Sequence, residues 1–253
     1  LPSTVRGACD LRDRLARPEL RELVGGLGAL PGAPRSFAAI TEALGRPEVC
    51  LDTVASIIER DAGCSAKLLQ LVNSAFFGLA RSVTQVRDAV SYLGVVRVRD
   101  VVLAAEAGAM FQPTTPQLAV IAQAVNDHSV LVAAAARELT DRAHTHDAFV
   151  AGMLHDIGRL ALATVLGSRY AAIEQARVQG ADTTAMELEV LGATHAEVGG
   201  YLLQLWGLPY PLVDAVARHQ DPDVTEDANP LLAAVATAQQ QVDAGVESEG
   251  SGA

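Results

Sequence analysis

The sequence has little cysteine, almost no lysine and no long uncharged apolar run. Its 253 residues include three cysteines, Cys9, Cys50 and Cys64, and no two of them form a CxxC pair. This argues against a disulfide framework and against a thiolate zinc site. The longest apolar run, from Val130 to Ala136, is far below the ~20 residues that a membrane-spanning helix needs. We therefore expect a soluble protein of a reducing cytoplasm, without a membrane partner.

Basic side chains are also scarce in the second half of the chain. The first 110 residues carry 13 basic and 12 acidic side chains, whereas the rest carries 6 and 18. The second half would repel a polyanion, so the composition does not favour nucleic acid as a partner. Scattered arginines on solvated helical faces are a commoner explanation than a basic patch for Arg81, Arg87, Arg97 and Arg99. The chain opens at Leu1 without a signal segment and is interpreted as part of a longer protein.

Apolar residues follow a helical spacing along almost the whole chain, and no run shows the alternation of a strand. Proline at position 18 divides residues 10–27 into two short helices. A proline-rich break at 112–116 marks a subdomain boundary. The predicted fold is all-α, with two packed helical subdomains. The predicted division is an N-terminal linker or helical segment (1–28), a helical subdomain (29–112), a second helical subdomain (113–244) and a disordered tail (245–253).

Four of the six histidines lie beside apolar helical faces in the second half: His128, His155, His195 and His219. The longest predicted helix, about 117–140, places His128 on its buried face. Another predicted helix, 148 to about 166, holds His155 next to Asp156. Neutral imidazole and carboxylate are ordinary ligands of divalent cations. A lone histidine on an apolar stripe is more often a core residue that bonds a backbone carbonyl, and we expect this role for His128 and His155.

Several motifs carry a family resemblance. They are Asn-Ser-Ala-Phe-Phe-Gly at 73–78, Tyr-Leu-Gly at 92–94, the stretch 151–160 around His155-Asp156, and Leu-Trp-Gly-Leu-Pro at 205–209. With these motifs the chain resembles the HDOD domain, the HD-related output domain of bacterial signalling proteins, over about residues 28–243. The resemblance implies two all-helical subdomains, the C-terminal one an HD-like bundle. Residues 6–23 resemble the junction that follows a receiver domain in response regulators of two-component systems.

The resemblance also implies a metal site with departures from the catalytic pattern. HD hydrolases use a histidine, the His-Asp pair and a later aspartate, and the HD-GYP branch adds histidines and a Gly-Tyr-Pro loop. The matching positions are His128, His155, Asp156, His195 and His219. Gln239 stands in the slot of the later aspartate, and Gln220 stands where a second histidine would follow His219. Losing an anionic ligand weakens the hold on a dication, so we expect no metal or a weakly bound divalent one.

These departures lead to a prediction of function. We predict a non-enzymatic signal-transduction output domain, without catalytic residues, that contacts a partner protein or a receiver or other domain of its own chain. The alternative is a metal-dependent phosphohydrolase or phosphodiesterase acting on nucleotides, cyclic dinucleotides included. Gln239 is the feature that discriminates between the two. Arg159 could contact a phosphate, but an arginine beside an aspartate is more often a structural pair.

The candidate interaction segment contains Asn73, Phe76, Phe77 and Gly78. It concentrates two of the five phenylalanines beside small residues. Adjacent side chains cannot readily point into one core, so we expect Phe76 to be buried and Phe77 to be at least partly exposed. The alternative is a tight junction between helices, packed into the core.

Overall fold

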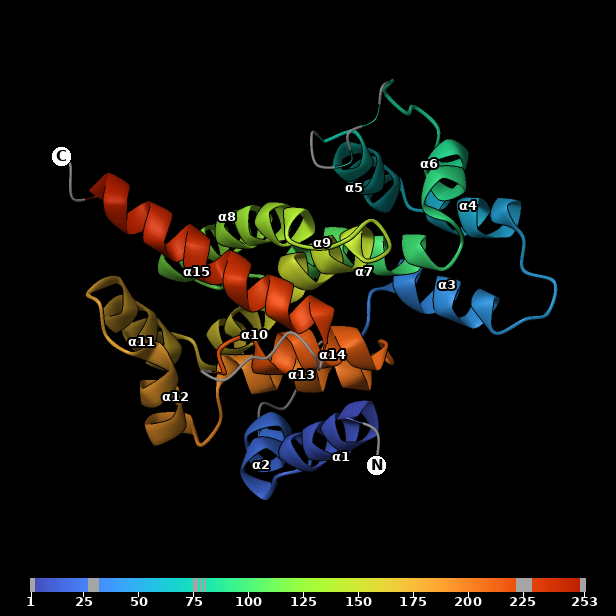
Figure 1. Ribbon diagram of the computed structural model, residues 1–253. Helices are drawn as coiled ribbons and strands as arrows, with labels where there is room; N and C mark the ends of the chain where they lie inside the picture. The colour runs from blue at the N-terminus through green and yellow to red at the C-terminus, as the bar shows by residue number, and fades with distance from the viewer. Residues whose placement is uncertain are drawn as a thin grey trace. The chain divides into compact units, whose positions relative to one another are not determined.

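The structure is a computed structural model that describes residues 3–26, 32–74, 77, 79, 81–221 and 229–250. Every regular element in this part of the chain is a helix, which confirms the all-α prediction. The chain divides into two units (Figure 1): Leu1–Pro31 together with Phe111–Ala253 form the larger one, and Gly32–Met110 form the smaller one. The N-terminal segment, separate in the predicted division, is thus grouped with the larger unit.

The smaller unit is a cluster of helices around apolar side chains. Phe37, Ile58, Leu68 and Leu103 are fully buried between them, because each lies on the inward stripe of its helix. Gly94 ends one helix with a φ of 83°, a left-handed conformation that glycine adopts without steric cost. The helices are α3 (Arg35–Leu44), α4 (Leu51–Glu59), α5 (Ala62–Val72), α6 (Val86–Leu93) and α7 (Arg97–Met110).

The candidate interaction segment begins in this unit, at the end of α5. The Asn73 side chain donates to the Val83 carbonyl and accepts from the Val83 amide, both at 2.7 Å, so it joins the end of α5 to Val83. Phe77 is only 8% exposed, and its ring meets the Tyr92 ring edge-on at 6.5 Å. The prediction of an exposed Phe77 is wrong because the ring packs against Tyr92. Two residues of the segment lie outside the described part of the chain: Phe76 and Gly78.

The larger unit is a helical bundle in which small residues allow close crossings. A Cβ on Gly152 would lie 2.5 Å from Ala133 Cα, and one on Gly200 would lie 2.5 Å from the Ala217 Cβ. The helices are α1 (Ser3–Leu15), α2 (Pro18–Gly26), α8 (Pro116–Glu138), α9 (Thr145–Leu154), α10 (Ile157–Leu166), α11 (Ser168–Val178), α12 (Thr183–Leu191), α13 (His195–Leu205), α14 (Tyr210–Arg218) and α15 (Pro230–Gly250). In this bundle α8 packs against α9 and α15, and α13 packs against α10 and α14.

Two predicted helix boundaries in this unit are wrong. The single helix predicted over 148–166 is two helices, because the chain turns at His155 and Asp156 between α9 and α10. Asp156 has φ −96° and ψ 12°, outside the helical region. The tail predicted from residue 245 is helical as far as Gly250, since α15 continues through it, and residues 251–253 lie outside the described part.

Among the described residues, two apolar stretches are long enough to cross a membrane by length and composition alone, Pro116–Glu138 and Thr145–Leu166. The second is interrupted at the α9–α10 turn, and 78% of its apolar window is buried inside the protein. The first packs against α9 and α15 within the bundle. Only the second window is thus mostly buried, as in the core helix of a soluble protein, because 28% of the window of the first is buried.

Candidate metal centre

The five predicted ligand residues meet at one place in the larger unit. His128 comes from α8, His155 and Asp156 from the α9–α10 turn, His195 from the first turn of α13 and His219 from the end of α14. The Nε2 atoms of the last three histidines lie 3.6, 3.3 and 3.7 Å from the Asp156 carboxylate, in the order His155, His195 and His219. The rings of His128 and His155 are 5.4 Å apart. Two groups therefore offer ligand atoms within 4.8 Å of one another: His128, His155 and Asp156, and Asp156, His195 and His219.

His128 lies at the edge of this cluster, because, contrary to the prediction, it is not among the buried residues of α8. Leu118, Val125 and Val132 are buried as predicted, but next to His128 the buried residue is Ser129; the other buried residues of α8 are Ala133 and Ala136. The His128 side chain is 18% exposed, which leaves its ring at the mouth of the cluster.

In three of the histidines, a hydrogen bond from Nδ1 to a group outside the cluster determines which ring nitrogen faces the centre. The Nδ1 atoms are 2.7 Å from an acceptor in three cases: His155 with the Gly152 carbonyl, His219 with the Val216 carbonyl and His195 with the Glu187 carboxylate. Since these oxygens only accept, Nδ1 carries the proton and Nε2 points inward. This arrangement aims three ring nitrogens at Asp156.

Three atoms in the centre are buried without a hydrogen-bond partner: His155 Nε2, His219 Nε2 and Asp156 Oδ1. Leaving such groups unpaired costs about 1–3 kcal/mol each. The core role expected for His155 is thus half realised, because Nδ1 bonds a backbone carbonyl while Nε2 stays unpaired. The Nε2 lone pairs of His155 and His219 point inward beside Asp156 Oδ1, and such a set of atoms is suited to bind a divalent cation.

A buried ion-pair network holds the other oxygen of Asp156. Arg159 Nη1 donates to Asp156 Oδ2, and the same guanidinium donates to both oxygens of Glu174 at 2.8 and 2.7 Å. This confirms the structural pairing expected for Arg159. Burial raises the pKa of the Asp156 carboxyl, but Arg159 and His155 outweigh burial and hold this pKa well below its usual range. Asp156 is therefore an anion whose Oδ1 is not held by an arginine and lies 3.3 Å from His195 Nε2.

The histidines of the cluster differ in charge. Burial lowers the pKa of His155 and, together with the neighbouring rings, lowers the pKa of His219 well below its usual value. Burial also opposes the charged form of His195, but Glu187 and Asp156 outweigh it and raise this pKa to about 9. Without a cation, His195 therefore carries the positive charge of the cluster at neutral pH, and binding a cation through its Nε2 would release that proton.

This proton makes the stability of the metal-free protein depend on pH. The pKa of His195 is near 6.5 when unfolded and about 9 when folded, so the folded state holds one extra proton between these values. We expect the free energy of unfolding in EDTA to fall by about 3 kcal/mol as the pH rises from 6.5 to 9. Urea titrations of wild type and His195→Gln across this range measure it. Equal slopes for the two proteins would contradict the prediction, and His144→Asn is the control for an exposed histidine.

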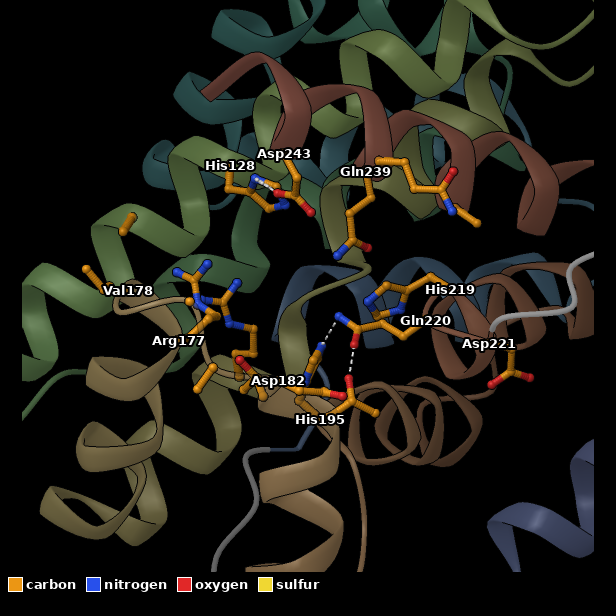
Figure 2. Close-up of a pocket in the computed structure, with 18 of the residues that line it drawn as sticks. His128, Arg177, Val178, Asp182, His195, His219, Gln220, Asp221, Gln239 and Asp243 are labelled. Carbon is orange, nitrogen blue, oxygen red and sulfur yellow. Dashed lines mark hydrogen bonds and ion pairs between the residues drawn. The ribbon is translucent and has the colours of Figure 1, made fainter. Parts of the chain in front are cut away.

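A pocket of about 1020 Å³ opens over the cluster. Figure 2 shows His195, His219, Gln220 and Gln239 lining it together. Gln239 Oε1 is buried without a partner, and the Gln220 amide lies 3.1 Å from His195 Nε2. Both glutamines, which the resemblance placed at ligand positions, thus face the cluster as neutral amides.

The sequence reasoning missed Asp243 and Glu187. Asp243 lies one helical turn beyond Gln239 on α15, with Oδ1 4.0 Å from His128 Nδ1. The i, i+4 spacing from Gln239 is a signal that could have found it. Glu187, which orients His195, belongs to a different helix and leaves no such signal.

Comparisons with known proteins identify the family of the chain. The HDOD domain model matches residues 30–222. The chain belongs to the HDOD domain family. This confirms the resemblance of the motifs to the HDOD domain, and the family match begins after α1 and α2, which end at Gly26.

Two solved structures resemble this HDOD protein over most of its length. A candidate phosphohydrolase from Shewanella amazonensis SB2B has 29% identity and a TM-score of 0.71, covering 90% of this chain and 81% of that one. An HDOD domain protein of unknown function from Geobacter sulfurreducens has 26% identity and a TM-score of 0.71, covering 91% and 78%. An uncharacterised protein of Treponema pallidum (strain Nichols) is 24% identical over 211 residues, which are 83% of this chain but 41% of that protein. The chain thus spans less than half of that curated relative.

Proposed function

We propose that this HDOD domain is a cytoplasmic signal-output module whose HD-like centre binds one divalent cation without hydrolysing a substrate. It relays its state through contacts with a partner protein or with another domain of its own chain. The observation that supports the binding of one cation most directly is the ion pair between Asp156 and Arg159. A carboxylate that bridges two metal ions through both oxygens offers one oxygen to each, and here Oδ2 is taken by Arg159. One oxygen remains for one cation.

The rest of the donor set supports a binding role over a catalytic one. Within the described residues, the two groups that could hold a metal share a single carboxylate, Asp156. The nearby positions at which the resemblance expects an aspartate and a histidine hold the neutral amides of Gln239 and Gln220. A Lewis-acid ion supplies nucleophilic water in metal hydrolases, and the protein must place a base and charge around it. Histidine and one carboxylate suit zinc, manganese or iron as ligands.

We expect wild type to bind one Mn²⁺ or Zn²⁺ per chain and to gain about 2.7 kcal/mol of stability when the free metal is 100-fold above Kd. Asp156→Asn removes the only anion of the ligand groups and should abolish both effects. Isothermal titration calorimetry and thermal unfolding with and without metal measure them. His144→Asn is the matched control, because this exposed histidine lies outside the ligand groups and asparagine can also precede a helix. A wild type without measurable metal affinity would overturn the cation site.

An assay of the wild-type protein tests whether the centre hydrolyses a substrate. Incubation with c-di-GMP, c-di-AMP or a simple phosphoester plus Mn²⁺ should give no product above a His155→Ala, Asp156→Ala control. A metal-dependent phosphohydrolase is the second candidate, because a large pocket with Arg177 at its wall opens over the histidines and one similar structure is a candidate phosphohydrolase. Turnover that the double substitution abolishes would establish this alternative.

A further inference from the structure

The N-terminal helices α1 and α2, which the HDOD family match does not include, pack directly on the metal-centre helices. Leu11, Leu15 and Leu20 are buried, with at most 4% of each side chain exposed. Helix α1 contacts α13 and α14, and α2 contacts α13. Residues 3–26 are therefore docked on the two helices that carry His195 and His219.

Two arginines of this segment bind carboxylates of the bundle. Arg14 donates from Nε to Glu197 at 2.9 Å and from Nη1 to both oxygens of Asp221 at 2.9 and 2.8 Å. Arg17 donates to the other oxygen of Glu197 at 2.6 Å. The Glu197 side chain is 3% exposed, so these ion pairs hold a buried anion. Such pairs are sensitive to the loss of one partner, because the remaining charge stays buried.

Each carboxylate lies two residues from a ligand position. Glu197 follows His195 by two residues and forms the capping box with Thr194 at the start of α13. Asp221 follows His219 by two residues, directly after Gln220, whose amide contacts His195. The Arg14 guanidinium therefore links the beginning of α13 to the end of α14, the two points at which His195 and His219 enter the centre.

We propose that Arg14 and Arg17 are positioning residues for the metal centre, so that the docking of α1 and α2 sets the cation affinity. The inference rests on the cation site proposed above. When Arg14 is paired, Glu197 and Asp221 are held together, and the spacing of His195 and His219 is fixed. By linkage, a bound cation must tighten the docking of the N-terminal helices by the same factor.

The test compares R14Q and R17Q with R12Q. Arg12 is on the same helix as Arg14, but its side chain is 71% exposed and, among the described residues, pairs only with the exposed Asp13, so R12Q removes the same charge without touching the bundle carboxylates. We expect the Kd for Zn²⁺ to rise about tenfold in R14Q, the low end of the range for partners that bond a metal ligand directly, because Arg14 acts through Glu197 and Asp221. The rise should be smaller in R17Q, which touches only Glu197, and R12Q should match wild type.

A second readout does not need the metal. In the zinc-free protein, the ring-nitrogen NMR signals of His195 and His219 should shift in R14Q and stay in place in R12Q. With Zn²⁺, amide exchange in residues 3–26 of wild type should slow. If wild type binds no Zn²⁺, the proposed cation site is wrong. The NMR signals of His195 and His219 then still show whether Arg14 positions these two histidines.

Equal Kd values and equal histidine signals in R14Q, R17Q and R12Q would overturn the coupling. If a single variant does not fold, the triple variant R14Q/R17Q/E197Q replaces it. This variant leaves no charge buried without its partner at Glu197, and glutamine is accepted at that position of a capping box. It should show the same rise in Kd, and an unchanged Kd in the folded triple variant would refute the proposal.

Discussion

Replacing Arg159 with methionine should lower the free energy of unfolding of the metal-free protein by about 3–5 kcal/mol. Arg159 is 4% exposed and pairs with Asp156 and Glu174, so its loss leaves two carboxylates buried without their shared cation. Urea unfolding followed by circular dichroism in EDTA measures the change. A loss below about 1 kcal/mol, the range of exposed pairs, would contradict the prediction.

The matched control is Arg177→Met, which removes the second arginine that pairs with the Glu174 carboxylate. Arg177 donates to Glu174 at 3.1 Å, but its side chain is 40% exposed and solvent replaces much of the lost interaction. Its loss should cost no more than about 1 kcal/mol.

A saturating divalent cation should also restore part of the stability of the Arg159→Met protein, because the ion neutralises Asp156. It should not restore the stability of the double variant Arg159→Met, Asp156→Asn.

Gly158→Ala should be comparably damaging, with a loss of about 4 kcal/mol or more. A Cβ at this position would lie 1.9 Å from the His195 carbonyl oxygen and 2.8 Å from the Gly199 amide nitrogen. Overpacking usually costs 1–3 kcal/mol, but here the obstacles are backbone atoms that cannot rotate away. Helices α10 and α13 must separate, and His195 moves with α13. We therefore expect the folded fraction of this variant to lose metal affinity as well.

Gly245→Ala makes the same chemical change where nothing lies within 4 Å of the added carbon. Position 245 is an exposed site inside α15, so alanine should stabilise the protein by up to about 1 kcal/mol. Thermal and urea unfolding of both variants test the pair. The steric argument fails if Gly158→Ala is as stable as wild type.

Part of this protein was predictable from local pattern alone. Helical spacing without strand alternation gave the all-α class, and Pro18 correctly marked the break between α1 and α2, because both effects act within a few residues. The motifs at 73–78 and 92–94 led to the family. Local pattern failed where neighbours in space decide, at the turn at His155-Asp156 and at Phe77, which is buried against Tyr92. It also missed the last turns of α15, which replace the predicted tail up to Gly250.

The sequence by itself determined the helical class, the family and the set of residues able to hold a metal. Only the tertiary structure decided how these residues act. It aimed the Nε2 atoms inward through Gly152, Val216 and Glu187, and it committed one oxygen of Asp156 to Arg159. It also joined Arg14 to Asp221 across 207 positions of sequence. The contacts of His155, His219 and Asp156 join residues three positions apart, whereas the Arg14–Asp221 pair depends on helix packing between distant segments, which no periodicity or spacing along the chain encodes.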